Sequence, residues 1–385
     1  MKSLPIIAAL LCSVAAFAQA TPQGPSVFPE PMPGNFIEHD FQFKTGDHLD
    51  IRMRFYTLGS PVKGANGQVR NAVLILHGTG GSGRSLLVPM FAGKLFCPGC
   101  LLDATKYFII SPDNLGHGDS SKPSNGMRMS FPHYDYDDMV LLQHQLLTEA
   151  LHIDHLRLVI GTSMGCMHSW LWAEQYPNFI DAAMPLACLP VEIAGRNRMW
   201  RKMLMDGIRN DPAWNKGNYT QQPLQGLRLA EDMLLIAGNA PLFNQMQAPT
   251  REAADRILDQ RFTRGIDSLD ANDLLYQIDA SRNYDPSPKL ESIRVPVMAV
   301  NSADDFINPP ELGILEREIK RVKHGCAVVL PITDQTRGHG THTFAAVWGS
   351  YLAELLQKSG GTAPGTSWNG SGSTLDDRKV CSLNW

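Results

Sequence analysis

The chain has 385 residues, of which 43% are hydrophobic and 19% are charged. This composition supplies enough apolar material for a large core and lacks the low hydrophobicity of disordered chains. The formal net charge is −4 and no basic cluster is present. Because binding to a phosphate backbone needs a concentrated patch of Lys and Arg, the composition argues against a nucleic-acid partner.

The first segment, residues 1–20, has the pattern of a secretory signal peptide. It carries one Lys, then an apolar run, then Ala18-Gln19-Ala20, which has the small-x-small form of a cleavage site. The run is shorter than the ~20 apolar residues that span a bilayer. We therefore expect a mature chain with no stable membrane span, located in the periplasm or secreted.

Six runs of apolar, mostly β-branched residues predict buried strands. Such runs, separated by helical patterns, are typical of the parallel sheet of an α/β protein. They lie at residues 72–76, 107–111, 156–160, 182–187, 295–300 and 326–330.

Residues 190–285 interrupt this rhythm of strands and helices. They are rich in Met, Arg and Gln and contain no strand pattern of comparable quality. We expect a helical cap here, inserted into a core formed by residues 21–189 and 286–358. The final segment, residues 359–385, is rich in Gly and Ser and predicts a flexible tail.

The cysteines suggest both a disulfide and buried thiols. In an oxidising compartment, Cys97 and Cys100 in "FCPGC" could form a disulfide, whereas a redox-active motif would need a thioredoxin-like context that is missing. Cys166, Cys188 and Cys326 lie in apolar stretches, which predicts small core residues. No second clustered pair suggests a zinc site.

The segment "LVIGTSMGCMHSW" places Ser163 between a strand and a helix. Gly161-Thr162-Ser163-Met164-Gly165 has the G-x-S-x-G spacing of a nucleophile elbow, in which a sharp turn exposes the serine hydroxyl. Glycines on both sides let the helix pass close to the strand. We predict that Ser163 is a nucleophile at the carboxyl end of its strand.

The loop after the strand at 72–76 predicts an oxyanion hole. It reads "HGTGGSG" and can direct backbone N–H groups toward Ser163. Thr79 from this loop and Met164 from the elbow are the expected donors. A phosphate-binding loop is the alternative, but no G-K-[ST] follows.

A serine nucleophile needs a base and an orienting acid, and both follow two later strands. The acid candidates are Asp304 and Asp305, after the strand at 295–300, and the base candidates are His339 and His342, after the strand at 326–330. The order Ser, Asp, His is that of the α/β hydrolases.

These stretches together resemble the homoserine O-acetyltransferase branch of the α/β hydrolases. The likeness is carried by "YFIISPDNLGHGDSSKPS", "FPHYDYDDMVLLQHQLLTEALHI", "GTSMGCMHSWLWAEQYP" and, within the cap, "IRNDPAWNKGNY" followed by "GLRLAE". The resemblance implies an α/β-hydrolase fold with a mostly parallel sheet and a helical cap or lid. It also implies Ser163 as nucleophile, Asp305 as acid, four residues before Pro309, and His339 as base, with Asp304 and His342 as alternatives.

The chain departs from the family in its cap and its elbow. The transferases carry Ala-Arg where this chain has Ala230-Glu231, and that Arg is expected to hold the carboxylate of the amino-acid substrate. Thr162 and Cys166 stand where Gly is usual. Glu231 in the substrate pocket would repel a carboxylate. The proposed export also separates the chain from homoserine and acetyl-CoA, which are cytoplasmic metabolites.

We therefore predict a secreted or periplasmic serine ester hydrolase that forms an acyl-enzyme. The expected partner is a small-molecule ester of apolar or mixed character, and no metal or organic cofactor is implied. The alternatives are an O-acyltransferase of the homoserine O-acetyltransferase type and a non-catalytic binding protein on the same scaffold. The oligomeric state is left open.

Overall fold

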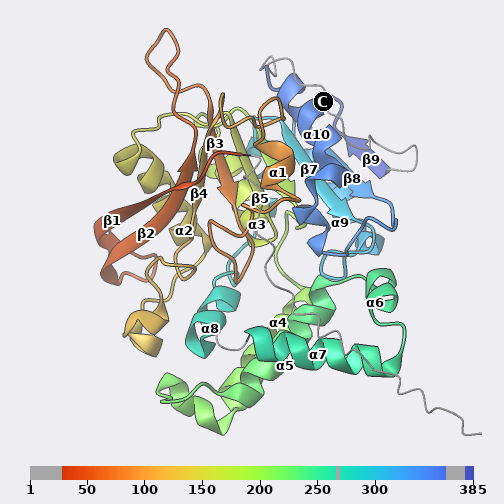
Figure 1. Cartoon of the computed structure of the whole chain (residues 1–385). Coiled ribbons are helices and arrows are strands. Elements are labelled where there is room, and N and C mark those ends of the chain that lie inside the picture. The colour runs from red at the N-terminus through yellow and green to blue at the C-terminus, as the bar shows by residue number, and fades with distance from the viewer. Residues whose placement is uncertain (1–27, 266–268, 361–377) are drawn as a thin grey trace, which may run out of the picture.

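A single sheet organises the protein in a computed structural model that describes residues 28–265, 269–360 and 378–385. Its nine strands follow the order β1-β2-β4-β3-β5-β6-β7-β8-β9 (Figure 1). The six central strands, from β4 to β8, are parallel, while β1, β2 and β9 pair antiparallel at the two edges. The strands are β1 Met32–Gln42, β2 His48–Leu58, β3 Ala72–Leu76, β4 Phe108–Pro112, β5 Leu158–Thr162, β6 Ala183–Leu186, β7 Val297–Ser302, β8 Gly325–Leu330 and β9 Arg378–Cys381.

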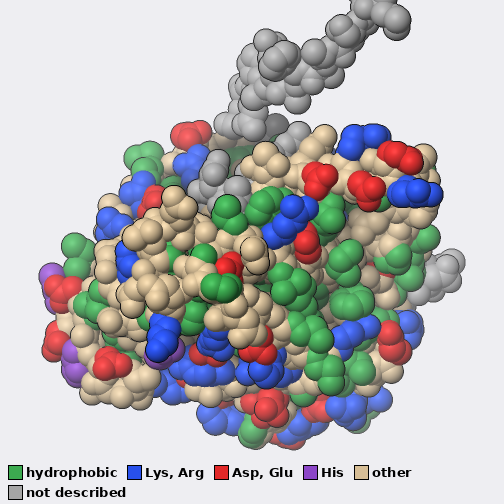
Figure 2. All heavy atoms as spheres, turned by 90° about the horizontal axis from the view of Figure 1, so that it is seen from below, with side chains coloured by type: hydrophobic (Ala, Val, Ile, Leu, Met, Phe, Trp, Pro, Cys, Tyr) green, Lys and Arg blue, Asp and Glu red, His purple; other side chains and the backbone are tan. Residues whose placement is uncertain are grey.

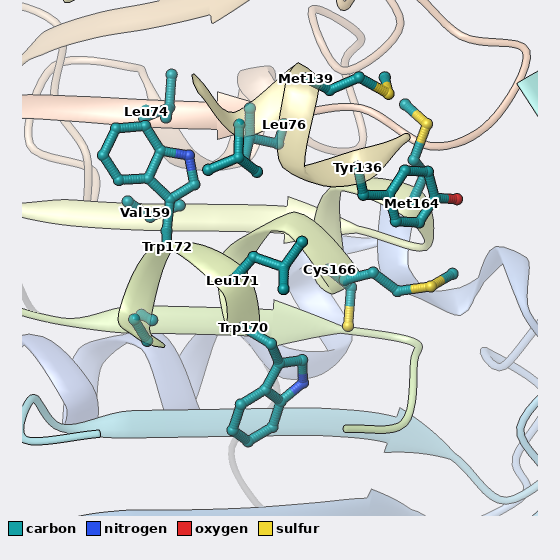
Figure 3. Packing of buried hydrophobic residues seen from close by; sticks show 14 of the residues in the cluster. Leu74, Leu76, Tyr136, Met139, Val159, Met164, Cys166, Trp170, Leu171 and Trp172 are labelled. Atoms are coloured by element: carbon teal, nitrogen blue, oxygen red, sulfur yellow. The ribbon is translucent and has the colours of Figure 1, made fainter. Parts of the chain in front are cut away.

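Helices cover both faces of the sheet, which is why the central strands are apolar at every position. Leu74, Leu76 and Val159 pack in one cluster with side chains of α2 and α3 (Figure 3). Val73 and Ile75 point to the other face and pack with α1 and α10. The core helices are α1 Ala92–Leu95, α2 Tyr136–Gln145, α3 Met164–Gln175, α9 Ile314–Glu318 and α10 Ala345–Lys358. The predicted mostly parallel α/β architecture is confirmed.

In the described residues between β6 and β7, five α-helices form the cap, below the sheet in Figure 1. Trp200, Leu204 and Ile208 lie on one side of α4 and pack with residues of α5 and α8 in a small core of their own. The cap helices are α4 Gly195–Asn210, α5 Leu224–Gly238, α6 Pro241–Gln247, α7 Arg251–Gly265 and α8 Ala271–Asp279. These helices all fall within the residues predicted for the cap.

The outer surface of the cap carries apolar side chains among charged ones. Met199 and Met203 of α4 and Leu242 of α6 are each more than half exposed. Figure 2 views the molecule from the cap side, where apolar side chains lie among Lys, Arg, Asp and Glu. The alternation on α4 of these Met residues with buried Trp200 and Leu204 is that of an amphipathic helix.

The expected flexible tail over residues 359–385 is wrong at its end. Residues Arg378–Cys381 form β9, which adds an antiparallel edge strand to β8. The Gly- and Ser-rich composition that suggested a tail belongs to residues 361–377, which lie outside the described residues.

The six cysteines in the described part of the chain are paired, which corrects the expectation that three of them are simple core residues. Cys166, Cys188 and Cys326 are buried as predicted, but each belongs to a disulfide. The pairs are Cys97–Cys100, Cys166–Cys188 and Cys326–Cys381. The third pair joins β8 to β9 and so fixes the last strand to the sheet.

The predicted signal peptide, residues 1–20, lies outside the described residues. Within the parts of the chain that the structure describes, no helix combines the length and the apolar character needed to cross a bilayer.

The disulfide between β8 and β9 should contribute more stability than the short one. Cys326 and Cys381 are 55 residues apart and Cys97 and Cys100 only 3, and a cross-link restricts the unfolded chain more when its loop is longer. Replacing Cys326 and Cys381 by Ala should lower the free energy of unfolding by about 4 kcal/mol, against about 2 kcal/mol for Cys97 and Cys100. Urea unfolding of the two double variants measures both, and equal losses would contradict this expectation.

Candidate active site

Ser163 occupies a strained turn between β5 and α3. Its backbone angles are φ 54° and ψ −108°, in the positive-φ region that side chains rarely adopt. Close packing requires the flanking glycines: a Cβ on Gly161 would lie 2.0 Å from the carbonyl oxygen of Gly165, and one on Gly165 would lie 2.2 Å from that of Leu76. This turn has the geometry of a nucleophile elbow, with the serine at the carboxyl end of a central strand.

His339 contacts both Ser163 and Asp305, one with each ring nitrogen. The Nε2 atom of His339 is 2.8 Å from Oγ of Ser163, and Nδ1 is 2.9 Å from Oδ2 of Asp305. The three residues follow β5, β7 and β8, whose carboxyl ends meet at one edge of the parallel sheet. In the tautomer that this geometry requires, Nδ1–H donates to Asp305 and Nε2 accepts from the serine hydroxyl.

The carboxylate of Asp305 is fully buried and held by four donors. Oδ1 accepts from the backbone N–H groups of Ile307 and Asn308, and Oδ2 accepts from His339 and the Asn308 amide. Burial by itself would raise the pKa of Asp305, but the electrostatic interaction with the neighbouring His339 and these hydrogen bonds outweigh it and lower the pKa. The group is therefore kept ionised despite its burial.

Asn308 is a site residue that the sequence reasoning missed. Its Nδ2 donates to Asp305 Oδ2 at 3.0 Å and to the carbonyl oxygen of Ala187 at 3.0 Å. It thus ties the acid to the loop after β6. Its position just before Pro309, in the same loop as the acid, is the only sequence signal that could have pointed to it.

The two alternative residues, Asp304 and His342, take other positions. Oδ1 of Asp304 accepts from the hydroxyl of Ser302 at 2.5 Å, so this carboxylate is bound locally. The ring of His342 packs edge-on against that of His339, with centroids 5.3 Å apart. Burial lowers the pKa of His342 to about 3, which keeps it neutral. The structure brings Asp305 and His339, rather than these neighbours, to Ser163.

The loop expected to form the oxyanion hole lies against the serine. A Cβ on Gly78 would be 3.2 Å from Cβ of Ser163, and Thr79 is the next residue. Met164 is the first residue of α3, so its N–H has no partner inside the helix. These positions suit the two N–H donors that the sequence suggested, and their role as donors stays a prediction.

A buried polar network beneath this loop was not foreseen. Nδ1 of His77 bonds to the carbonyl oxygen of Gly78, and its Nε2 meets the backbone N–H and the side-chain amide of Asn114. Gln143 then links Asn114 to His168. Burial lowers the pKa of His77 and that of His168, the latter to about 3, so both rings are neutral. The network holds the loop through neutral hydrogen bonds.

The cap contacts both loops that carry the acid and the base. Arg196, at the start of α4, donates from Nη2 to the carbonyl oxygen of Phe306 at 2.6 Å, directly after Asp305. On the other side, a Cβ on Gly338 would lie 2.8 Å from the carbonyl carbon of Asn239, at the end of α5. The positions of Asp305 and His339 therefore depend on the cap as well as on the sheet.

A cavity of about 660 Å³ lies between the start of α4 and the acid loop. Its lining combines apolar side chains such as Met167 and Ile193 with polar ones, including Asn197 and Asn308. Asn308 also binds Asp305. Cap and core thus enclose a space of ligand size next to the residue that supports the acid.

Glu231 lies on α5, and its carboxylate faces a cation of the cap. Its Oε2 is 3.6 Å from Nε of Arg261 on α7. Among the described residues, no hydrogen bond or ion pair joins Glu231 to Ser163, Asp305 or His339. Its charge is partly offset by Arg261, and its predicted place in a substrate pocket stays a prediction.

The chain is similar to α/β hydrolases and to acyltransferases among them. The family described as alpha/beta hydrolase fold matches residues 71–346. A probable acyltransferase of Methanothermobacter thermautotrophicus is 30% identical over 289 residues, which cover 74% of this chain and 87% of that protein. A homoserine O-acetyltransferase of Geotalea uraniireducens is 32% identical over 275 residues, covering 62% of this chain and 74% of that protein.

The fold is also shared with solved structures. An acetylester hydrolase from Corynebacterium glutamicum superimposes with a TM-score of 0.72 at 21% identity, over 85% of this chain and 95% of that one. This likeness concerns the fold alone.

Replacing Asn308 by Ala should make Asp305 less effective in supporting His339. Removal of the amide donor raises the pKa of Asp305, because that hydrogen bond lowers it, so the carboxylate is protonated at higher pH and supports His339 less well. We expect Ser163 to react with a fluorophosphonate probe about tenfold more slowly, the usual cost of one hydrogen bond to a charged group, with the loss growing as the pH falls. Asn301→Ala is the control, because Asn301 donates to Cys188 and not to Asp305. Equal labelling rates for the two variants would contradict the role of Asn308.

Proposed function

Because the chain belongs to the α/β hydrolase superfamily, in its homoserine O-acetyltransferase-like branch, we propose that it is a serine ester hydrolase that works through an acyl-enzyme. The observation that carries this proposal is the continuous contact from Ser163 through His339 to Asp305. A serine hydroxyl becomes a competent nucleophile only when a base takes its proton and an acid orients that base.

In the first half-reaction, the serine attacks the ester. Oγ of Ser163 forms a bond to the carbonyl carbon while Nε2 of His339 accepts the hydroxyl proton. The N–H groups of Thr79 and Met164 stabilise the resulting oxyanion. The tetrahedral intermediate then collapses, the bond to the alcohol oxygen breaks, and His339 gives the proton to the departing alcohol. The acyl group remains on Ser163, and Asp305 stabilises the imidazolium that forms in between.

In the second half-reaction, water takes the place of the alcohol. His339 accepts a proton from the water as its oxygen attacks the acyl carbon. Collapse of the second intermediate breaks the bond to Oγ, the carboxylic acid leaves, and Ser163 regains its proton. The net reaction consumes one ester and one water and yields one acid and one alcohol, without a metal or an organic cofactor.

The second candidate is an O-acyltransferase, which shares the first half-reaction and differs only in the acceptor. It is favoured by the relatives named homoserine O-acetyltransferase. Two features favour water. Glu231 stands where the resemblance places an Arg of the transferases, and the expected export would remove the chain from the cytoplasm. An acetylester hydrolase shares the fold, so the scaffold is compatible with water as acceptor. The third alternative is a binding protein that does not catalyse a reaction. The contact between Ser163 and His339 does not support this alternative.

We place the protein outside the cytoplasm. The pattern of residues 1–20 supports this location. Three disulfides give further support, because disulfides persist in oxidising compartments and are rare in cytosolic proteins. Fractionation of cells that express the full chain, followed by N-terminal sequencing of the product, tests the location.

The two histidines provide a matched pair for testing the mechanism. Ser163→Ala should reduce turnover of p-nitrophenyl acetate by about 10⁶-fold, and His339→Ala should be nearly as damaging because the two residues act as one unit. His342→Ala should cost far less, since His342 packs on His339, and it is His339 that hydrogen-bonds to Ser163. Thermal unfolding of all three variants checks that they fold. A larger loss for His342→Ala than for His339→Ala would reassign the base.

The acceptor separates the hydrolase from the transferase. With acetyl-CoA or p-nitrophenyl acetate as acyl donor, we expect release of acetate to water at a rate that homoserine does not change. Glu231 supports this expectation: a homoserine carboxylate held about 4 Å from it, where the transferases carry their Arg, would be repelled by roughly 1 to 4 kcal/mol, depending on screening by water and by Arg261. Product analysis by mass spectrometry distinguishes acetate from O-acetylhomoserine. Efficient formation of O-acetylhomoserine would overturn the hydrolase assignment.

A further inference from the structure

Arg201, on α4 of the cap, is a buried cation without a counterion. Its side chain is only 3% exposed. Nε donates to Oδ1 of Asn197 at 2.9 Å, and Nη1 donates to the hydroxyl of Ser281 at 3.2 Å. Both partners are neutral, and no Asp or Glu within the described ranges forms an ion pair with this guanidinium.

The other deeply buried arginine shows that the fold can compensate such a charge. Arg157 is 6% exposed, donates to a backbone carbonyl and to Ser359, and has a carboxylate of Asp181 within 4.0 Å. Leaving a charge in the interior without a partner is costly. The ring of Trp200, whose centroid is 4.9 Å from the guanidinium carbon of Arg201, offsets part of this cost, and a bound anion would offset more.

Further unsatisfied polar groups surround Arg201. The side chains of Arg201, Thr79 and Ser281 all lie close enough to the Tyr136 hydroxyl to act on it. Tyr136 is 1% exposed, and its hydroxyl lies near these three side chains but makes no well-directed hydrogen bond among the described residues. The hydroxyl of Thr79 likewise makes no well-directed hydrogen bond within the described ranges. Groups that can donate hydrogen bonds thus gather around a cation, without an acceptor that carries charge.

This cluster adjoins the reacting serine. Thr79 follows Gly78, which lies against Ser163, so the cluster begins at the loop expected to form the oxyanion hole. Figure 3 shows Tyr136 and Met164 at the same end of the buried cluster, where α3 begins. Asn197, which binds Arg201, also borders the cavity of about 660 Å³.

We infer that Arg201 is a specificity-determining residue that binds a carboxylate carried by the ester substrate, with Tyr136 as a second donor. The inference rests on the proposed ester hydrolysis and names its substrate class. A guanidinium offers a planar fork that matches the two oxygens of a carboxylate. A single cation balances one negative charge, which favours a carboxylate over a phosphate. The carboxylate can belong to the acyl half or to the alcohol half, since both halves are joined at the ester group that Ser163 attacks.

Two pairs of esters test this inference and distinguish the halves. In the acyl arm, mono-p-nitrophenyl succinate is compared with its methyl ester, and in the alcohol arm, 4-acetoxybenzoate is compared with methyl 4-acetoxybenzoate. We expect kcat/KM to favour the free carboxylate by at least about tenfold in one arm. Arg201→Met should reduce this ratio by about 10- to 100-fold, the range for a hydrogen bond to a charged group. Lys202→Met is the control, because Lys202 is the next residue on α4 and its cation is exposed to solvent. This variant should leave the ratio unchanged.

A second measurement uses the unmodified protein and does not depend on the folding of a variant. Succinate should slow the labelling of Ser163 by a fluorophosphonate probe, whereas succinamide at the same concentration should not. A preference for the methyl ester in both arms, an Arg201→Met ratio equal to that of the parent, or equal protection by succinate and succinamide would each overturn the inference. Failure of the parent to hydrolyse even p-nitrophenyl acetate would instead refute the proposed function.

Discussion

The hydrogen bond between Nδ1 of His339 and the buried carboxylate of Asp305 is the contact on which the rest of the site depends. It fixes which ring nitrogen faces Ser163, and it keeps a charge in a place where burial alone would neutralise it. Asn308 and two backbone N–H groups share this task, so the acid is positioned by its own loop before any ligand arrives. The orientation of the Asp305 carboxylate sets the orientation of the His339 ring, and the ring in turn orients the hydroxyl of Ser163.

The sheet makes this contact possible because its central strands are parallel. Strands β5, β7 and β8 end at the same edge, so loops that are far apart in sequence meet there. The elbow adds a second constraint, since the positive φ of Ser163 is maintained by close packing of α3 on β3. Below the loop of Gly78, neutral histidines bind through hydrogen bonds and add no charge next to the reacting centre.

The cap adds charged groups to those of the core around the site. Two charged side chains of the cap differ in their partners. The carboxylate of Glu231 already faces Arg261, whereas the guanidinium of Arg201 is buried among neutral groups. Electrostatic selection of a substrate therefore falls to Arg201 in our proposal. The contacts of Arg196 and Asn239 with the catalytic loops also mean that a movement of the cap would be felt at Asp305 and His339.

The sequence by itself determined the central strands, the elbow and the order Ser, Asp, His, because buried strands and sharp turns have local patterns. It missed β1 and β2, whose alternation of more and less exposed residues differs from the continuous apolar runs of a parallel sheet. The residue pattern alone left Asp304 and His342 open beside Asp305 and His339, which the family resemblance favoured, since nearby candidates have the same chemistry and differ only in direction. The pairing of Cys326 with Cys381 and the isolation of Arg201 likewise depend on segments far apart in the chain, which only the tertiary structure brings together.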